Sequence, residues 1–111
     1  MGTIFQKIID RQIPADFVYE DDRVCAFRDI NPQAPVHILV IPKKPLPGIA
    51  DATEEDCGLI GHLMYCAAQI AQKEGLKDYR LVINNGAGAG QTVFHLHVHI
   101  LAGRLFGWPP G

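Results

Sequence analysis

Hydrophobic and polar residues alternate most regularly near the end of the chain, in the segment FHLHVHIL at residues 94–101. In a β-strand successive side chains point to opposite faces, so residues two apart share a face. We therefore predict a strand here whose apolar members face a core: Leu96, Val98 and Ile100. The polar members should form a row on the other face, with neighbours roughly 6.5–7 Å apart: His95, His97 and His99.

Helical periodicity marks two other segments. Thr3 followed by Gln6 matches a capping box, and the apolar residues behind it predict a short helix over residues 3–10. A long helix is predicted from the N-cap Thr53 to a glycine stop at Gly75. Its apolar residues recur at helical spacing on one face: Ile60, Leu63, Met64, Ala67 and Ala71.

Runs rich in β-branched and aromatic residues predict the remaining strands, at 17–19, 24–27, 36–42 and 79–84. A short charged turn separates the first two runs, which favours a hairpin and antiparallel pairing. Together the elements indicate an α+β fold with a mainly antiparallel five-stranded sheet, one long helix and one short helix. At 111 residues the chain should form a single domain, residues 1–111.

Charge and composition exclude several classes of function. The net charge of −2 gives no basic field, so we expect no nucleic acid as a partner. No apolar run approaches the roughly 18 residues of a membrane span, and no secretory signal is recognisable. We therefore expect a cytoplasmic protein without a membrane partner. Cys25, Cys57 and Cys66 lie far apart without C-x-x-C spacing, which predicts reduced and mostly buried thiols.

The histidine row is the strongest indication of chemistry. Imidazole titrates near neutral pH and serves as nucleophile, acid or base, so such a row on a rigid strand suits catalysis. A metal site and an ordinary solvent-facing strand are the competing interpretations. The glycine-rich stretch at 85–91, alone a flexible turn, can bring backbone N–H groups against an anion beside the row. Asn84 and Thr92 can add neutral donors there, although both are also ordinary turn and strand residues.

Several stretches together resemble the histidine triad (HIT) family of nucleotide hydrolases and transferases. HLHVHIL at 95–101 matches the family signature of three alternating histidines. Three further stretches are similar to its nucleoside phosphoramidase (Hint) branch: FRDINPQAPVHILVIPKK, GAGAGQTVFHLHVHILAGR and the ending WPPG. The resemblance implies an α+β fold and a homodimer that joins two sheets into one.

The resemblance also implies a reaction and residue roles. His97 would attack the α-phosphorus of an adenosine or guanosine 5′-monophosphoramidate, or of an acyl- or aminoacyl-adenylate, and water would hydrolyse the resulting nucleotidyl-histidine. The carbonyl of His95 would accept a hydrogen bond from the His97 ring, and Asp29 would hold the ribose hydroxyls. The other catalytic residues implied are His37, Thr92 and His99. The substrate-binding residues implied are Phe27, Asp29, Ile30, Asn84, Gly90, Gln91 and Val93, with Phe27 and Ile30 walling the base.

This chain departs from the family pattern at several points. His99 stands where related transferases carry glutamine, which favours hydrolysis over nucleotidyl transfer. Thr92 replaces the serine common in the branch but keeps its hydroxyl. The paired-cysteine zinc motif of many relatives is missing from residues 2–7, so we expect no metal and no cofactor. The ending from Trp108 should influence leaving-group choice, or else plug the edge of a dimer.

Two alternative functions stay open at this point. One is a hydrolase of dinucleoside polyphosphates from the same family, against which the WPPG ending and the GQTV approach to the triad argue. The other is a purine-nucleotide-binding interaction protein whose turnover is incidental. A binding site and a slow active site use the same residues, so sequence does not separate them.

Overall fold

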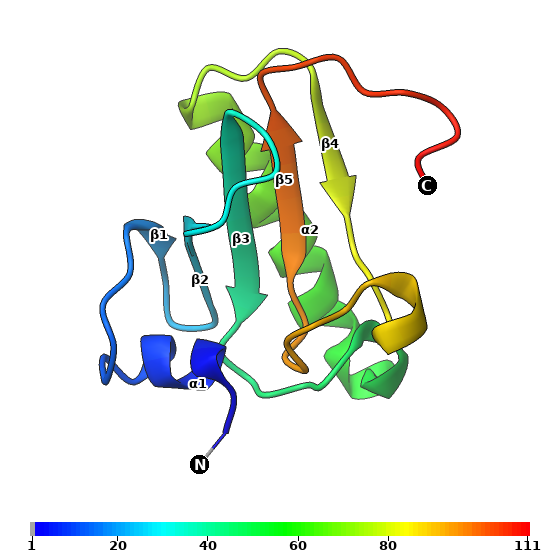
Figure 1. Ribbon diagram of the computed structural model, residues 1–111. Coiled ribbons are helices and arrows are strands. Elements are labelled where there is room, and N and C mark those ends of the chain that lie inside the picture. Colours follow the sequence, from blue (N-terminus) through cyan, green and yellow to red (C-terminus); the bar gives the residue numbers. More distant parts are fainter. Residues whose placement is uncertain (1) are drawn as a thin grey trace.

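The computed structural model describes residues 2–111 and is built around one five-stranded antiparallel sheet (Figure 1). Its strands are β1 (Phe17–Glu20), β2 (Val24–Arg28), β3 (Val36–Pro42), β4 (Tyr79–Val82) and β5 (Val98–Ala102). They lie in the order β1-β2-β3-β5-β4. The hairpin of β1 and β2 and the bounds of β3 are as predicted, and the α+β prediction is confirmed.

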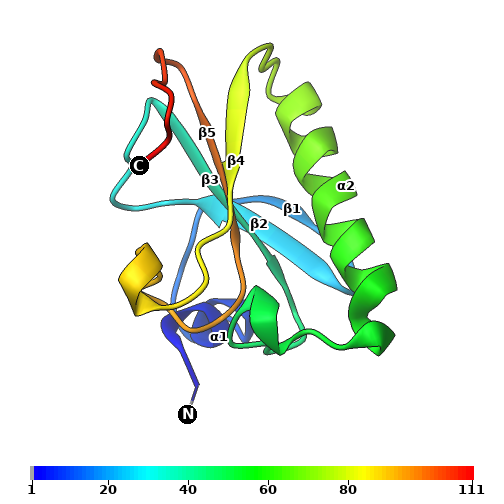
Figure 2. The same ribbon diagram turned by 90° about the vertical axis from the view of Figure 1, so that its right-hand side faces the viewer.

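Two helices flank the sheet on opposite faces (Figure 2). In α1 (Ile4–Ile9) the Thr3 hydroxyl accepts the Gln6 N–H at 3.2 Å, whereas the Gln6 side chain bonds Asp10 instead of closing the capping box. The long helix α2 (Cys57–Lys73) begins after a 3₁₀ turn at Glu54–Asp56, which Thr53 caps. Gly75 takes the left-handed φ of +73° just beyond the helix, which glycine adopts without steric cost.

The main core lies between α2 and the sheet. The three apolar members of the alternating segment face it, as predicted, together with residues from β2, β3 and α2. Its most deeply buried members are Val24, Ala26, Ile38, Val40, Leu63, Ala67, Leu96, Val98 and Ile100. A smaller core on the other face packs α1 onto β2 and β3 through Phe5, Ile8, Cys25, Phe27, Leu39 and Ile41.

The strand around the histidines is shorter than predicted. β5 begins at Val98, so residues 94–97 run outside the ladder and only His99 of the row is a strand residue. The Leu96 N–H donates to the Leu46 carbonyl at 2.7 Å, and the His95 ring turns inward onto the Pro42 carbonyl at 2.7 Å. These bonds to the end of β3 and to the connector after it replace sheet pairing. β4 likewise ends two residues before Asn84.

Cys25 and Cys66 are buried free thiols and Cys57 at the start of α2 is an exposed one, which agrees with the prediction of reduced and mostly buried thiols. Within residues 2–111, no helix combines the length and the apolarity needed to cross a bilayer.

Candidate active site

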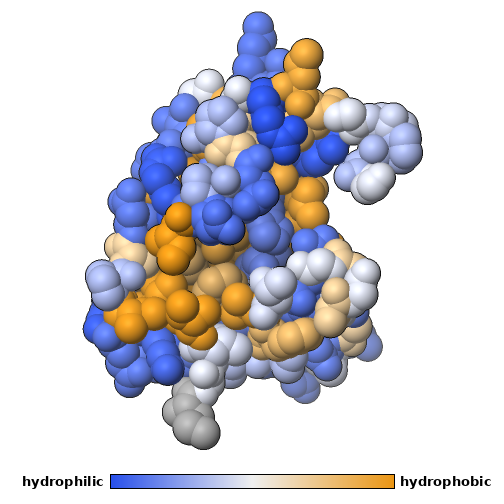
Figure 3. Space-filling model, viewed as in Figure 1, coloured by the Kyte–Doolittle hydropathy of each residue, from blue (hydrophilic) through white to orange (hydrophobic). Residues whose placement is uncertain are grey.

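A cavity of about 550 Å³ lies on the α1 face of the sheet, bounded by α1, the loop after β2 and the glycine-rich loop. Its polar lining residues are Asp29, Asn31, Gln33, His37, Asn84, Thr92, His97 and His99. Its apolar lining residues are Ile4, Phe5, Ile30, Leu39, Val82, Val93 and Leu101, with Gly90 completing the wall. Figure 3, viewed onto this face, shows hydrophobic residues gathered over α1 and toward the middle of the face.

Strand register brings two of the histidines together. Leu39 of β3 pairs with His99 of β5, and His37 pairs with Leu101, so His37 and His99 are diagonal neighbours on one face. Their ring centroids are 5.2 Å apart, and that of His97 lies 4.8 Å from that of His99. The rings of His37, His97 and His99 therefore form the cluster at the floor of the cavity.

The His97 ring is held in one tautomer. Its Nδ1 lies 2.7 Å from the His95 carbonyl oxygen, which can only accept, so Nδ1 carries the proton. The lone pair is then on Nε2. The Phe5 ring packs nearly perpendicular to the His97 ring at a centroid distance of 5.0 Å, which restricts the orientation of the imidazole. His97 is thus a buried, oriented imidazole with one free nitrogen.

A chain of hydrogen bonds fixes the protons of the other two rings. The Gln33 main-chain N–H donates to His37 Nδ1 at 3.0 Å, which leaves the His37 proton on Nε2. That Nε2 lies 2.9 Å from His99 Nδ1 and 3.5 Å from a carboxylate oxygen of Asp29, so it donates to His99. The His99 proton is consequently on Nε2. Among residues 2–111, this Nε2 is the one buried side-chain nitrogen or oxygen without a partner.

The loop that carries Gln33 is tied to the end of β5. The Arg104 Nε donates to the Gln33 carbonyl at 3.2 Å, from the segment just after the strand. Gly103 has a φ of +96° there, and a Cβ on it would lie 2.7 Å from the Cβ of Pro35. Only glycine fits between these two segments without moving one of them.

Burial keeps these imidazoles neutral. It lowers the pKa of His37, His95 and His97 below the usual 6.5. Burial, with repulsion from His97 and His37, lowers the pKa of His99 to about 4. At neutral pH His97 therefore offers a lone pair and His99 offers a proton donor, without a charge on either ring.

These lowered pKa values predict that the fold weakens in mild acid. The unfolded chain takes up protons on these histidines near pH 6.5, whereas the folded chain resists them, His99 down to about pH 4. Stability should therefore be full above pH 6.5 and fall progressively toward pH 4, above the range where most carboxylates protonate. Urea midpoints at intervals between pH 7.5 and pH 4.5 test this. His99→Gln should flatten the slope, and a wild-type midpoint constant between pH 7 and pH 5 would contradict the prediction.

The structure places three predicted site residues outside the cavity lining. The Phe27 side chain is 3% exposed and packs edge-on against Phe5 at 5.5 Å, so Phe5 stands where Phe27 was expected. The His95 ring is turned away onto the Pro42 carbonyl, so only its own carbonyl serves the site. Gln91 also lies behind the lining. In each case the side chain packs or forms hydrogen bonds inside the protein and does not reach the cavity.

Gln91 braces the glycine-rich loop. Its side-chain oxygen accepts the Gly86 N–H at 2.8 Å, and its amide nitrogen donates to the carbonyls of Pro47 and Val93 at 2.7 and 3.1 Å. Gly86 and Gly90 have φ of +94° and +100°, at the two ends of a 3₁₀ turn. The loop is therefore a fixed wall rather than the flexible turn that its composition suggests.

The other predicted binding residues line the cavity. One Asp29 oxygen accepts the Asn31 N–H at 2.8 Å, which orients the second toward His37. Ile30 stands 93% exposed at the rim. Asn84, Gly90, Thr92 and Val93 line the wall formed by the glycine-rich loop. Sequence reasoning missed Phe5, whose place in an amphipathic helix signals only packing, and Gln33, which acts through its main chain.

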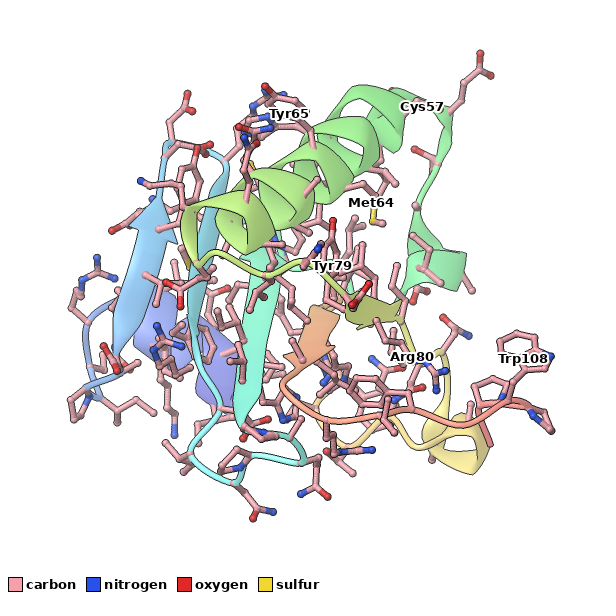
Figure 4. All side chains as sticks on the ribbon, turned by 90° about the horizontal axis from the view of Figure 1, so that it is seen from above. Cys57, Met64, Tyr65, Tyr79, Arg80 and Trp108 are labelled. Carbon is pink, nitrogen blue, oxygen red and sulfur yellow. The ribbon has the colours of Figure 1, made fainter. Side chains whose placement is uncertain are left out.

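The C-terminal segment lies apart from this chain's cavity. The Gly107 carbonyl accepts from Arg80 at 2.8 Å, and the guanidinium of Arg104 lies 4.3 Å from the centre of the Phe106 ring. Trp108 points away from the rest of the molecule and is 84% exposed (Figure 4). Within this chain, therefore, Trp108 plugs nothing.

Three residues that line the cavity carry side chains of the kind that bind metal ions. The ligand atoms of Asp29, His37 and His99 lie within 4.8 Å of one another. His37 Nε2 and His99 Nδ1 lie 2.9 Å apart and form the hydrogen-bonded relay described above.

Comparison with known proteins places the chain in a family. It matches the HIT domain over residues 10–105. An HIT-like protein of Synechocystis is 64% identical over 110 residues, which cover 98% of this chain and 96% of that protein. A 14 kDa zinc-binding protein of Zea mays is 55% identical over 112 residues, covering 98% and 88%.

Similarity extends to solved structures. The crystal structure of an HIT family hydrolase from Legionella pneumophila matches with a TM-score of 0.95 and 47% sequence identity, covering 99% of this chain and all of that one. Sequence, fold and the clustered histidines agree, and this chain belongs to the HIT domain family.

Proposed function

We propose that this protein hydrolyses the P–N bond of purine nucleoside 5′-monophosphoramidates, the activity of the Hint branch of the HIT family. One observation carries the proposal. His97 offers a free Nε2 lone pair beside the partnerless Nε2 proton of His99, in a cavity with an apolar wall and a carboxylate. A nucleophile next to an unused donor suits attack on a phosphorus atom whose oxygens gain negative charge.

In the first step His97 Nε2 would bond to the α-phosphorus while the P–N bond breaks. The leaving nitrogen, protonated from solvent, departs as the neutral amine. The His97 ring becomes positively charged as it forms the nucleotidyl-histidine, and the His95 carbonyl, 2.7 Å from Nδ1, stabilises that charge. His99 Nε2–H would bind a phosphoryl oxygen. In the second step water attacks phosphorus, a proton returns to solvent, and nucleoside monophosphate and free His97 remain.

The remaining lining supports recognition of a nucleotide. Asp29 lies at the edge of the cavity, where a carboxylate can accept from both ribose hydroxyls. Ile4, Phe5, Ile30 and Leu39 offer apolar surface to a purine ring. Thr92, Gly90 and Asn84 would face the phosphate and the leaving group. The hydrolase named in the Legionella structure gives independent support for a hydrolytic reaction.

One assay separates the candidate functions. Purified protein would be incubated with adenosine 5′-phosphoramidate and, separately, with diadenosine polyphosphates, and products followed by ³¹P NMR. We expect AMP and ammonia from adenosine 5′-phosphoramidate and little reaction with the diadenosine polyphosphates. The reverse ranking would favour the polyphosphate hydrolase. Binding of AMP without turnover of either substrate would favour the interaction protein.

Activity should not depend on a metal ion. The proposed nucleophile must keep its Nε2 lone pair for phosphorus, and neutral imidazole needs no metal to attack. The maize relative is named for zinc, so the prediction needs a direct check. Protein treated with chelator, with its metal content measured, should keep its full rate. A rate that disappears on chelation and returns only with zinc would contradict the proposed mechanism.

We also propose that two chains form a homodimer through α2 and β4. β4 is an edge strand of the sheet, and Ala68, Gln69 and Gln72 of α2 line one shallow hollow with its first residue, Tyr79. A two-fold dimer needs a self-complementary surface, and we propose this region for it. Sedimentation equilibrium at micromolar concentration should give twice the 12.2 kDa of the chain. A mass of 12.2 kDa under those conditions would refute the dimer.

A further inference from the structure

A second cluster of ligand-type side chains lies on the other face of the sheet, where α2 packs. Asp21 belongs to the turn between β1 and β2, which reaches α2 (Figure 2). His62 and Cys66 are four residues apart on α2, so both side chains lie on the same side of the helix. Neither the proposed reaction nor the dimer uses these residues.

Three potential ligand atoms converge there. His62 Nε2 lies 2.6 Å from an Asp21 carboxylate oxygen, Oδ2. Cys66 Sγ lies 3.5 Å from that Nε2 and 3.8 Å from that Oδ2. The Tyr19 hydroxyl lies 2.7 Å from the same oxygen. The side chains of Asp21 and His62 are each 23% exposed, so the cluster opens to solvent on one side.

Asp21 is preorganised for this arrangement. Its other oxygen, Oδ1, accepts the main-chain N–H groups of Arg23 and Val24, both at 2.8 Å, which fixes the carboxylate in the turn. Oδ2 is thereby held toward His62 and Cys66. A carboxylate anchored through one oxygen can give the other to a ligand without losing its own support.

The two distances to sulfur match tetrahedral zinc. Zinc bonds of about 2.3 Å to sulfur and about 2.0–2.2 Å to nitrogen and oxygen require S···N and S···O separations of roughly 3.5 Å and an N···O separation of roughly 3.3 Å. The two sulfur separations are already within about 0.3 Å of these values. The His62 nitrogen and the Asp21 oxygen, hydrogen-bonded at 2.6 Å in the metal-free protein, would have to separate by about 0.7 Å on binding.

We propose that Asp21, His62 and Cys66 bind one zinc ion per chain, with water or the Tyr19 hydroxyl in the fourth position. Thiolate and imidazole ligands favour zinc over magnesium or calcium. On binding, the Cys66 thiol releases its proton to solvent, and the proton of the His62 ring resides on Nδ1. The ion would join the β1–β2 turn to α2 across the sheet from the proposed nucleophile. Its effect should therefore be on stability and not on catalysis.

The experiment uses the full chain freed of metal with a chelator and then titrated with zinc. Wild type should bind one zinc per chain by calorimetry and metal analysis. Its melting temperature should rise by roughly 10 °C with free zinc at about 100 times the dissociation constant. Cobalt, used as a spectroscopic substitute, should give the charge-transfer absorption of a thiolate ligand.

Matched variants locate the metal. Cys66→Ser and His62→Gln should each weaken zinc binding by about 100-fold or more, and Cys66→Ser should remove the thiolate band. Cys57→Ser, on the same helix, should behave as wild type. Circular dichroism of the metal-free variants confirms that they fold. Failure of wild type to bind zinc at micromolar concentration overturns the proposal.

The histidine cavity provides the competing location. Zinc binding that survives Cys66→Ser but is lost in His99→Ala would place the metal with Asp29 and His37 instead, and would also overturn the proposal. The outcome is independent of the proposed reaction, because binding and melting temperature are measured without substrate.

Discussion

Replacing His97 with asparagine should abolish turnover of adenosine 5′-phosphoramidate while AMP still binds with an affinity close to wild type. Asparagine removes the Nε2 lone pair, so no covalent intermediate can form, yet it leaves most of the cavity wall in place. Loss of a nucleophile costs roughly 10⁴-fold or more in the catalytic rate. Single-turnover kinetics and calorimetric titration with AMP measure the two quantities separately.

The matched control for this variant is His62→Asn, which changes a histidine on the opposite face of the sheet. Its rate should stay within about two-fold of wild type. Acid quenching of the wild-type reaction should trap a nucleotide on the protein, and the His97 variant should trap none. A variant at His97 that retains more than about 3% of the wild-type rate would show that this ring is not the nucleophile.

His99→Ala should lower the rate constant of the chemical step by roughly 10²–10³-fold, with a smaller effect on substrate binding. The change removes the Nε2 proton donor that the folded protein leaves without a partner. Removing one preorganised donor to a developing negative charge typically has an effect of about this size. Burst-phase measurements distinguish the chemical step from product release.

His37 serves as a positioning residue in this interpretation, because it contacts the site through its 2.9 Å bond to His99. His37→Ala alone should therefore slow the reaction less than His99→Ala. The double variant His37→Ala/His99→Ala should be no slower than His99→Ala, because His37 acts only through the His99 ring that this variant already lacks. Additive effects of the two substitutions would instead mean that His37 acts on the substrate independently.

The sequence predicted the regular parts of the molecule well. β3 has the predicted bounds, and α2 ends before Gly75, because long apolar periodicity and helix-ending glycine are strong local signals. The apolar alternation through Leu96, Val98 and Ile100 also placed the correct face on the core. The same alternation predicted a strand at 94–97 wrongly, because that segment bonds instead to Pro42 and Leu46, which are far away in the sequence.

The candidate site could be predicted only in part. His37, His97 and His99 were identified, but which ring nitrogen carries a proton depends on partners such as the His95 carbonyl that no spacing reveals. Phe5 displaced Phe27 from the cavity wall because α1 folds back over β2, a tertiary contact. The proposed zinc ligands could not be predicted from the sequence either, because Asp21 is 41 residues from His62 and neither forms a recognisable motif with Cys66.

The hydrogen bond from the Gln33 main chain to His37 has a consequence for how residue 33 can vary. The donor is a peptide N–H, so every amino acid except proline supplies it, and the side chain there is free to change without disturbing the protons of the relay. Proline at this position would delete the donor and let His37 place its proton on either nitrogen. The proton on His99 Nε2 therefore depends on the path of the backbone at residue 33 more than on the side chain there. Arg104 and Gly103 hold that path in place.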